Sequence, residues 1–199
     1  MNINLNVQLL KGALECAGKK DVRYYLNGVF IDVLNEEELV YCGTDGHILF
    51  AAKAPLDSTS GDPVGTSLTI PRTVIEAALK GVKSQTVELA AVHEGSYRLN
   101  QTIFLPVDGK FPDYQRVIPQ EVSGEKATFD PDLLVRGSKA ISLSVGGRGE
   151  LQHNGEKAAV MTSASESVIV VVMPMRDQSY EVYKGWTKPK AYVDQSLAA

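Results

Sequence analysis

The sequence has little of what marks a redox, metal-binding or membrane protein. Its two cysteines, Cys16 and Cys42, lie far apart, without the paired spacing of a zinc site or a disulfide framework. No apolar run approaches the ~18 residues of a membrane-spanning helix, and residues 1–4 do not resemble a signal peptide. We therefore expect a cytoplasmic protein with buried, reduced thiols, no metal, no cofactor and no membrane partner.

An excess of positive charge is also absent. The 199 residues carry a formal net charge of −4, with 44% hydrophobic and 22% charged residues. These values are typical of a globular protein with a substantial core, arranged as one large or two small domains. The total charge therefore gives no indication of nucleic-acid binding.

Catalytic motifs are sparse. Cys42, Asp45 and His47 lie close together in the sequence and offer the nearest approach to a metal site or to a nucleophile with its base. No second cluster completes such a site, His93 and His153 stand in unrelated contexts, and the sequence has no glycine-rich phosphate loop. We do not expect an enzyme.

The most informative stretch covers residues 22–49. Residues 22–33 alternate large apolar with small or polar side chains, which predicts a strand with one buried face. Residues 40–43 and 48–52 predict two more strands around Thr44-Asp45-Gly46-His47. Asp-Gly between apolar runs is a strong hairpin signal.

The whole chain divides into three units, each a strand, a helix and three strands, which predicts an α+β fold. Unit one starts with a strand at 3–5 and an N-cap at Asn6. The apolar stripe of its helix is Leu10, Ala13, Leu14 and Ala17, and Gly18 ends it. Residues 55–65 predict a loop, because Pro, Ser, Gly and Asp dominate there.

The later units repeat this order. Unit two has a strand at 67–70, Pro71 at the first helical position, a helix ended by Gly81, and strands at 87–92, 97–99 and 103–106. Unit three has a strand at 126–129, a cap at Asp130 before Pro131, an inner helix face of Leu134, Ser138 and Ile141, and strands at 150–152, 158–162 and 168–173. We predict a complete domain at 1–108, an extended linker at 109–122, a half domain at 123–176 and an irregular tail at 177–199.

Four stretches resemble the bacterial β sliding clamp, the processivity factor of replicative DNA polymerase. They are RYYLNG (23–28), TDGH (44–47), FPDYQRVIP (111–119) and VVMPMR (171–176), and they follow in the family's order. The resemblance covers roughly residues 1–176 and implies a DNA-clamp fold. Units one and two resemble the family's middle domain, and unit three the second half of its last domain; the family's first domain and the first half of its third have no counterpart in this sequence.

The resemblance implies a hydrophobic cleft in which short peptides from polymerases, clamp loaders and repair proteins dock. By motif match its residues are Leu26, Thr44, Gly46, His47, Leu49, Pro112, Val117, Val171, Met173, Pro174, Met175 and Arg176, with Asp130 and Leu133 beside the second wall. The alternative is that these are ordinary strand and turn residues. Ile48 and Gln115 stand where family members commonly carry Arg, which predicts a cleft rim with fewer cations.

The resemblance also implies a ring around duplex DNA, lined by helices. Residues 7–20 and 72–83 each carry a net +2 and residues 130–141 carry zero, so the helical segments hold +4 and the remaining chain −8. A cationic inner surface on an acidic body suits sequence-independent attraction of phosphates. The candidate DNA contacts are Lys11, Lys19, Lys20, Arg23, Tyr24, Arg72, Lys80, Lys83, Arg136 and Lys139, with Tyr25 beside them. The alternative is that these lysines simply cover exposed helix faces.

The half domain predicts association. We expect it to leave an unpaired sheet edge and an unburied helix stripe that another copy would cover. Family rings contain twelve units, so three units per chain favour a homo-tetramer, and a dimer would already pair the half domains. The rival hypothesis is an interaction module that keeps the cleft, forms no ring and competes for clamp-binding peptides. For residues 177–199 the alternatives are weak occupancy of the cleft or, preferred, packing of Tyr183 or Trp186 on the outer face.

Overall fold

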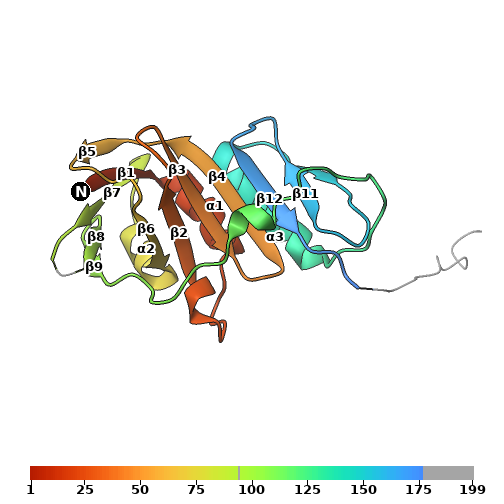
Figure 1. Cartoon of the computed structure of the whole chain (residues 1–199), viewed down its shortest axis with the longest axis horizontal. Coiled ribbons are helices and arrows are strands. Elements are labelled where there is room, and N and C mark those ends of the chain that lie inside the picture. Colours follow the sequence, from red (N-terminus) through yellow and green to blue (C-terminus); the bar gives the residue numbers. More distant parts are fainter. Residues whose placement is uncertain (94, 177–199) are drawn as a thin grey trace, which may run out of the picture.

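The computed structural model describes residues 1–93 and 95–176, which form two antiparallel sheets and three α-helices (Figure 1). The predicted tail at 177–199 lies outside the described residues. In the larger sheet the strand order is β10 (Glu150–Gln152), β11 (Ala159–Thr162), β12 (Val168–Val172), β4 (Ile48–Pro55), β3 (Glu38–Thr44), β2 (Gly28–Val33) and β6 (Ser67–Pro71). In the smaller sheet it is β5 (Ser58–Ser60), β1 (Asn2–Asn6), β7 (Thr86–Ala91), β8 (Tyr97–Leu99) and β9 (Thr102–Phe104).

Two of the three described helices begin where the sequence supplies a cap. Helix α1 (Val7–Cys16) starts after Asn6, whose side chain accepts hydrogen bonds from the backbone N–H groups of Gln8 and Leu9. Helix α3 (Pro131–Val145) starts after Asp130, with proline in its first turn as predicted. Helix α2 (Arg72–Ala78) is short and has no side-chain cap.

Helices α1 and α3 cover one face of the larger sheet, while α2 packs against β2 and β6 of the larger sheet and against β8 and β9 of the smaller sheet. Their buried side chains join a single apolar core with the inward-facing residues of the strands, such as Tyr41 and Phe50. Helices α1 and α3 lie against each other behind strands β4 and β12 (Figure 1). The core therefore runs without a break from unit one into unit three.

The predicted linker covers the opposite face of the sheet. Phe111 stacks on Phe30 of β2, with ring centroids 4.6 Å apart and planes 3° apart. The Tyr114 hydroxyl donates to Asp32 Oδ2 at 3.1 Å, and burial raises the pKa of Tyr114 to about 12. The linker is thus anchored on the sheet by aromatic packing, and it contains a 3₁₀ turn, Tyr114–Arg116, instead of being extended throughout.

Several predicted boundaries are wrong for local reasons. Residues 22–26 are not strand. The Asn27 side chain accepts from the Asp21 N–H and donates to the Asp21 carbonyl, which closes the segment around a 3₁₀ turn at Tyr24–Leu26, and Val22 is 94% exposed. The predicted loop at 55–65 contains β5, which pairs with β1. Pro71 ends β6 and precedes α2, which stops at Ala78 and not near Gly81.

Unit three also departs from its prediction. Residues 126–129 form no strand; this segment is held by single bonds, such as that from Met175 N–H to the Thr128 carbonyl. Ser138 is exposed, and the buried face of α3 is Gly137, Ala140, Ile141 and Ser144. The expectation of an unburied helix stripe is wrong, because that face packs on α1 and on β12. The division into a complete and a half domain stays a prediction.

Both cysteines are free and buried, as predicted, and burial raises the pKa of each thiol. None of the helices in residues 1–93 and 95–176 is long and apolar enough to cross a membrane.

Candidate functional site

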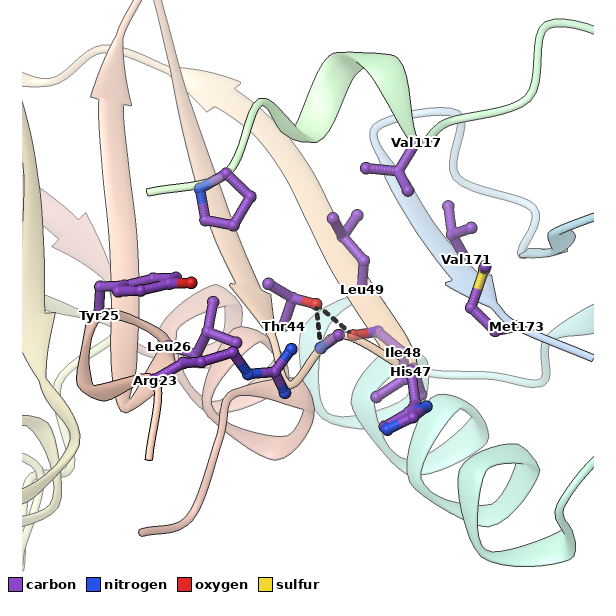
Figure 2. Close-up of a pocket in the computed structure, with 12 residues that line it drawn as sticks. Arg23, Tyr25, Leu26, Thr44, His47, Ile48, Leu49, Val117, Val171 and Met173 are labelled. Carbon is purple, nitrogen blue, oxygen red and sulfur yellow. Dashed lines mark hydrogen bonds between the residues drawn. The ribbon is translucent and has the colours of Figure 1, made fainter. Parts of the chain in front are cut away.

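An apolar cavity of about 160 Å³ opens on the outer face of the larger sheet (Figure 2). It lies between the linker, the turn that joins β3 to β4, and the end of β12. The lining residues are Arg23, Tyr25, Leu26, Thr44, Gly46, His47, Ile48, Leu49, Pro112, Val117, Val171 and Met173. We refer to this cavity as the cleft.

The apolar walls come from strand residues that face away from the helices. Leu49 of β4 pairs directly with Val171 of β12, and both are buried beneath the cleft. Leu26 closes the floor beside them, while Val117 of the linker is partly exposed at the opposite rim. Met173 is 41% exposed and supplies a flexible, polarizable thioether at the mouth.

The β3–β4 turn is held by its own side chains. Thr44 Oγ1 donates to the Ile48 carbonyl at 2.7 Å and accepts from Gly46 N–H at 3.0 Å (Figure 2). Asp45 Oδ1 accepts from the N–H groups of His47 at 2.9 Å and Ile48 at 3.1 Å. Gly46 has φ of +89°, a conformation that favours glycine. The predicted hairpin is confirmed, and it points the exposed His47 at the cleft mouth.

The structure brings together most of the predicted cleft residues and leaves some outside. Met173 donates its N–H to the His47 carbonyl at 2.9 Å, which ties β12 to the turn. The chain then leaves the cleft, because Met175 N–H bonds to Thr128. Outside the lining therefore lie Pro174, Met175, Arg176, Asp130 and Leu133.

Two lining residues, Arg23 and Tyr25, were missed as cleft residues, and Ile48, which was expected at the cleft rim, also lines the cleft. The adjacency of RYY to Leu26 was the available signal for the first two. The side chain of Ile48 is buried in the inner core and lies near Gly137 of α3, so the residue lines the cleft from the turn side. Arg23 places a guanidinium at the rim, and the loss of a rim cation at Ile48 stays a prediction.

Two of the predicted DNA contacts, Arg72 and Arg136, hold backbone carbonyls at the end of α1. The Arg72 guanidinium donates to the carbonyl oxygens of Leu14, Ala17 and Gly18. Arg136 donates to the carbonyls of Glu15 and Cys16. Together they satisfy the free carbonyls at the carboxyl end of α1, where positive charge is also favourable.

The other predicted basic residues lie nearer to solvent. Arg23 pairs with Asp21 at 2.7 Å and Lys139 with Glu15 at 3.0 Å, while Tyr24 is exposed. Five exposed lysines have no ion pair among the described residues: Lys11, Lys19, Lys20, Lys80 and Lys83. Lys11 lies on α1, Lys19 and Lys20 follow the end of α1 at Cys16, and Lys80 and Lys83 follow the end of α2 at Ala78.

The arrangement offers little to nucleophilic or metal chemistry. Cys42 is buried beneath the linker, and burial holds the pKa of its thiol well above the ordinary value. Asp45 is engaged by Arg136 at 2.6 Å. Within residues 1–93 and 95–176, no group of three or more His, Cys, Asp or Glu side chains is placed to hold a metal ion.

Comparison with known proteins identifies the family. Residues 7–113 match the family model for the DNA polymerase III beta subunit, central domain, and so more than half of the chain is covered. The chain belongs to the bacterial beta sliding clamp family. This confirms the resemblance drawn from the four motifs, and it agrees with the expectation of a non-enzymatic protein, because this is a family of processivity factors.

Individual beta sliding clamps show the extent of the match. The beta sliding clamp of Vibrio cholerae is 32% identical over 153 residues, which cover 72% of this chain and 41% of that protein. The beta sliding clamp of Proteus mirabilis is 36% identical over 107 residues, which cover 51% of this chain and 28% of that protein. The chain thus spans about two fifths or less of the length of these curated relatives.

Solved structures confirm the predicted DNA-clamp fold. The Caulobacter crescentus pol III beta structure superimposes with a TM-score of 0.68 at 19% identity, covering 88% of this chain and 66% of that one. The DNA polymerase III subunit beta from Pseudomonas aeruginosa gives a TM-score of 0.66 at the same identity and coverage.

Proposed function

We propose that this chain acts as a sliding-clamp platform that binds short peptides of DNA polymerase and clamp-loader type proteins in the cleft. The observation that carries the proposal is the composition of the cleft. Nine of the twelve residues implied by the family motifs line one apolar cavity: Leu26, Thr44, Gly46, His47, Leu49, Pro112, Val117, Val171 and Met173.

Physical chemistry supports a peptide as the occupant. A concave apolar site with a few polar groups at its rim is typical of a ligand site. The floor of Leu26, Leu49 and Val171 accepts aliphatic anchors, and the adaptable Met173 adjusts to their shape. His47 and Arg23 stand at the rim, where they can orient a peptide backbone.

Met173→Ala should weaken the binding of a short clamp-binding peptide, one with glutamine and hydrophobic anchors, by about 1–3 kcal/mol. Met175→Ala provides a matched control, because Met175 is 40% exposed, close to the 41% of Met173, yet lies outside the cleft. Fluorescence polarisation with a labelled peptide measures both. Equal affinity of the Met173→Ala variant and the unaltered protein would show that the cleft is not the peptide site.

We further propose that the helix-covered side faces duplex DNA. The support comes from the five exposed lysines that make no ion pair within residues 1–93 and 95–176, whereas Arg72, Arg136 and Lys139 each pair with a carboxylate. Lys11, Lys20, Lys80 and Lys83 changed together to Glu should abolish salt-sensitive retention on closed circular DNA. The control changes four lysines outside the helices, Lys53, Lys110, Lys126 and Lys157, to Glu. Unchanged retention by the helix-side variant, or equal loss in the control, would contradict this role.

Encircling DNA requires more than one copy of a three-unit chain. Among the described strands, four end their sheets with one neighbour each: β5, β9, β10 and β6. Ile103 of β9 and Leu105 just after it are 64% and 67% exposed, and exposed aliphatic side chains on a sheet edge favour association. We propose a homo-oligomer, with a tetramer favoured and a dimer allowed. Light scattering measures the molar mass of the same protein sample that is used for DNA retention. A mass of four or two chains supports the homo-oligomer, and a mass of one chain supports the rival, a monomeric module that competes for clamp-binding peptides.

A further inference from the structure

A second, charged cavity of about 330 Å³ adjoins the cleft. Its lining residues are Ala17, Gly18, Lys19, Asp21, Arg23, Asp45, His47 and Arg136. Arg23 and His47 also line the cleft, so the two cavities share a wall. In Figure 2 these two side chains lie on the side of the cleft away from Val117.

Both carboxylates in this cavity already have cationic partners. Asp21 accepts from Arg23 Nη2 at 2.7 Å and from Arg23 Nε at 3.0 Å, and this hydrogen bonding lowers the pKa of Asp21 to about 2. Asp45 accepts from Arg136 Nη1 at 2.6 Å and from two backbone N–H groups of its own turn. Neither aspartate is left to attract a positively charged ligand.

The unused groups are donors. Lys19 is exposed, and no ion pair joins it to any residue in the part of the chain that the structure describes. Arg23 places Nε and Nη2 on Asp21 and on the Asp45 carbonyl, while Nη1 makes no hydrogen bond to the described residues. Among the Lys, Arg and Asp side chains of the lining, three cations (Lys19, Arg23 and Arg136) face two carboxylates, a balance of +1.

We propose that this charged cavity binds a carboxylate of the peptide held in the cleft, the side chain of an Asp or Glu that flanks its apolar anchor. The proposal rests on the peptide-binding function of the cleft and assigns it a preference for acidic peptides. The shared wall explains why one extended peptide reaches both cavities. Lys19 and Arg23 supply the free positive charge, since charge-assisted hydrogen bonds to a carboxylate are stronger than neutral ones.

The test uses two labelled peptides that are identical except for Glu or Gln beside the apolar anchor. The unaltered protein should bind the Glu peptide about threefold to tenfold more tightly at low salt, with the ratio falling as salt is added. Lys19→Gln should bring the ratio close to one without changing affinity for the Gln peptide. Lys20→Gln is the matched control, because Lys20 is the adjacent exposed lysine but lies outside both cavities; it should keep the ratio.

The remaining outcomes of the peptide experiment distinguish failure of the carboxylate proposal from failure of the cleft proposal. Equal binding of the two peptides by the unaltered protein overturns the carboxylate proposal and leaves the cleft proposal standing. Binding of neither peptide overturns both. The third arm titrates a short duplex DNA: if Lys19→Gln weakens DNA binding and leaves the Glu-to-Gln ratio intact, the cavity receives a phosphate and the proposal is wrong.

Discussion

Replacing Gly43 with alanine should lower the free energy of unfolding by about 3 kcal/mol or more. Gly43 lies in β3 on the face that α1 covers. A Cβ atom added there would stand 2.1 Å from the Ala13 carbonyl oxygen and 2.8 Å from its carbonyl carbon. Backbone atoms of a packed helix cannot rotate aside as a side chain can, so α1 would have to move off the sheet.

Urea unfolding followed by circular dichroism measures this cost. Gly12→Ala should lower the free energy of unfolding less than Gly43→Ala. A Cβ atom added at Gly12 would lie 2.9 Å from the Ala140 carbonyl oxygen and 3.0 Å from the edge of the Phe50 ring, which is less close than the contact at Gly43. Thr59→Ala in the exposed edge strand β5 is the neutral control, within about 0.5 kcal/mol of the unaltered protein. If Gly43→Ala were as stable as this control, the close contact between α1 and β3 would be disproved.

The features that the sequence predicted correctly depend on neighbours along the chain. Asn6 and Asp130 cap their helices through backbone groups two or three residues away. The turn from Thr44 to Ile48 is likewise closed by hydrogen bonds within five residues. Such contacts are encoded locally, so propensity and spacing are enough to find them.

The features that were not predicted from the sequence depend on contacts between distant parts of the chain. A basic residue on a short helix predicts a solvated side chain, yet Arg72 reaches carbonyls of α1 that are 54 to 58 residues earlier. The pairing of β12 with β4 and the packing of α3 on α1 likewise join units one and three, which no local pattern indicates. Residues 126–129 form no strand: the corresponding strand of unit one, β1, pairs with β7 of unit two, and no described strand takes the place of β7 beside residues 126–129.

The candidate cleft was found through the family motifs and not through physics alone. Leu26, Pro112 and Val171 are ordinary apolar residues in isolation, and only their common position in known motifs indicated one site. The charged cavity beside the cleft was not predicted, since its lining comes from three segments far apart in the sequence: residues 17–23, the turn with Asp45 and His47, and Arg136 of α3.

Arg136→Met should both destabilise the fold and weaken peptide binding. Arg136 on α3 joins three elements: its Nη1 pairs with Asp45 at 2.6 Å, and its other nitrogens hold the last carbonyls of α1. The pair is largely shielded, with Arg136 and Asp45 side chains 24% and 17% exposed. Removing the cation leaves a carboxylate and two carbonyls without their partner, which should cost about 2–3 kcal/mol of unfolding free energy.

The effect on binding follows from the position of Asp45 in the turn that forms one wall of the cleft. With Arg136 gone, Asp45 Oδ1 still accepts from His47 and Ile48, but nothing fixes the carboxylate against α3. We expect peptide affinity to fall about tenfold, because a wall that must be ordered on binding reduces affinity. Lys139→Met, on the same helix and more exposed, is the control and should change neither quantity much. Asp45→Asn and the double variant Arg136→Met/Asp45→Asn complete a double-mutant cycle. We expect the two substitutions to be strongly coupled, both in the free energy of unfolding and in peptide affinity. If Arg136→Met lowered stability but left peptide affinity unchanged, the turn would keep its shape through its own hydrogen bonds, contrary to this prediction.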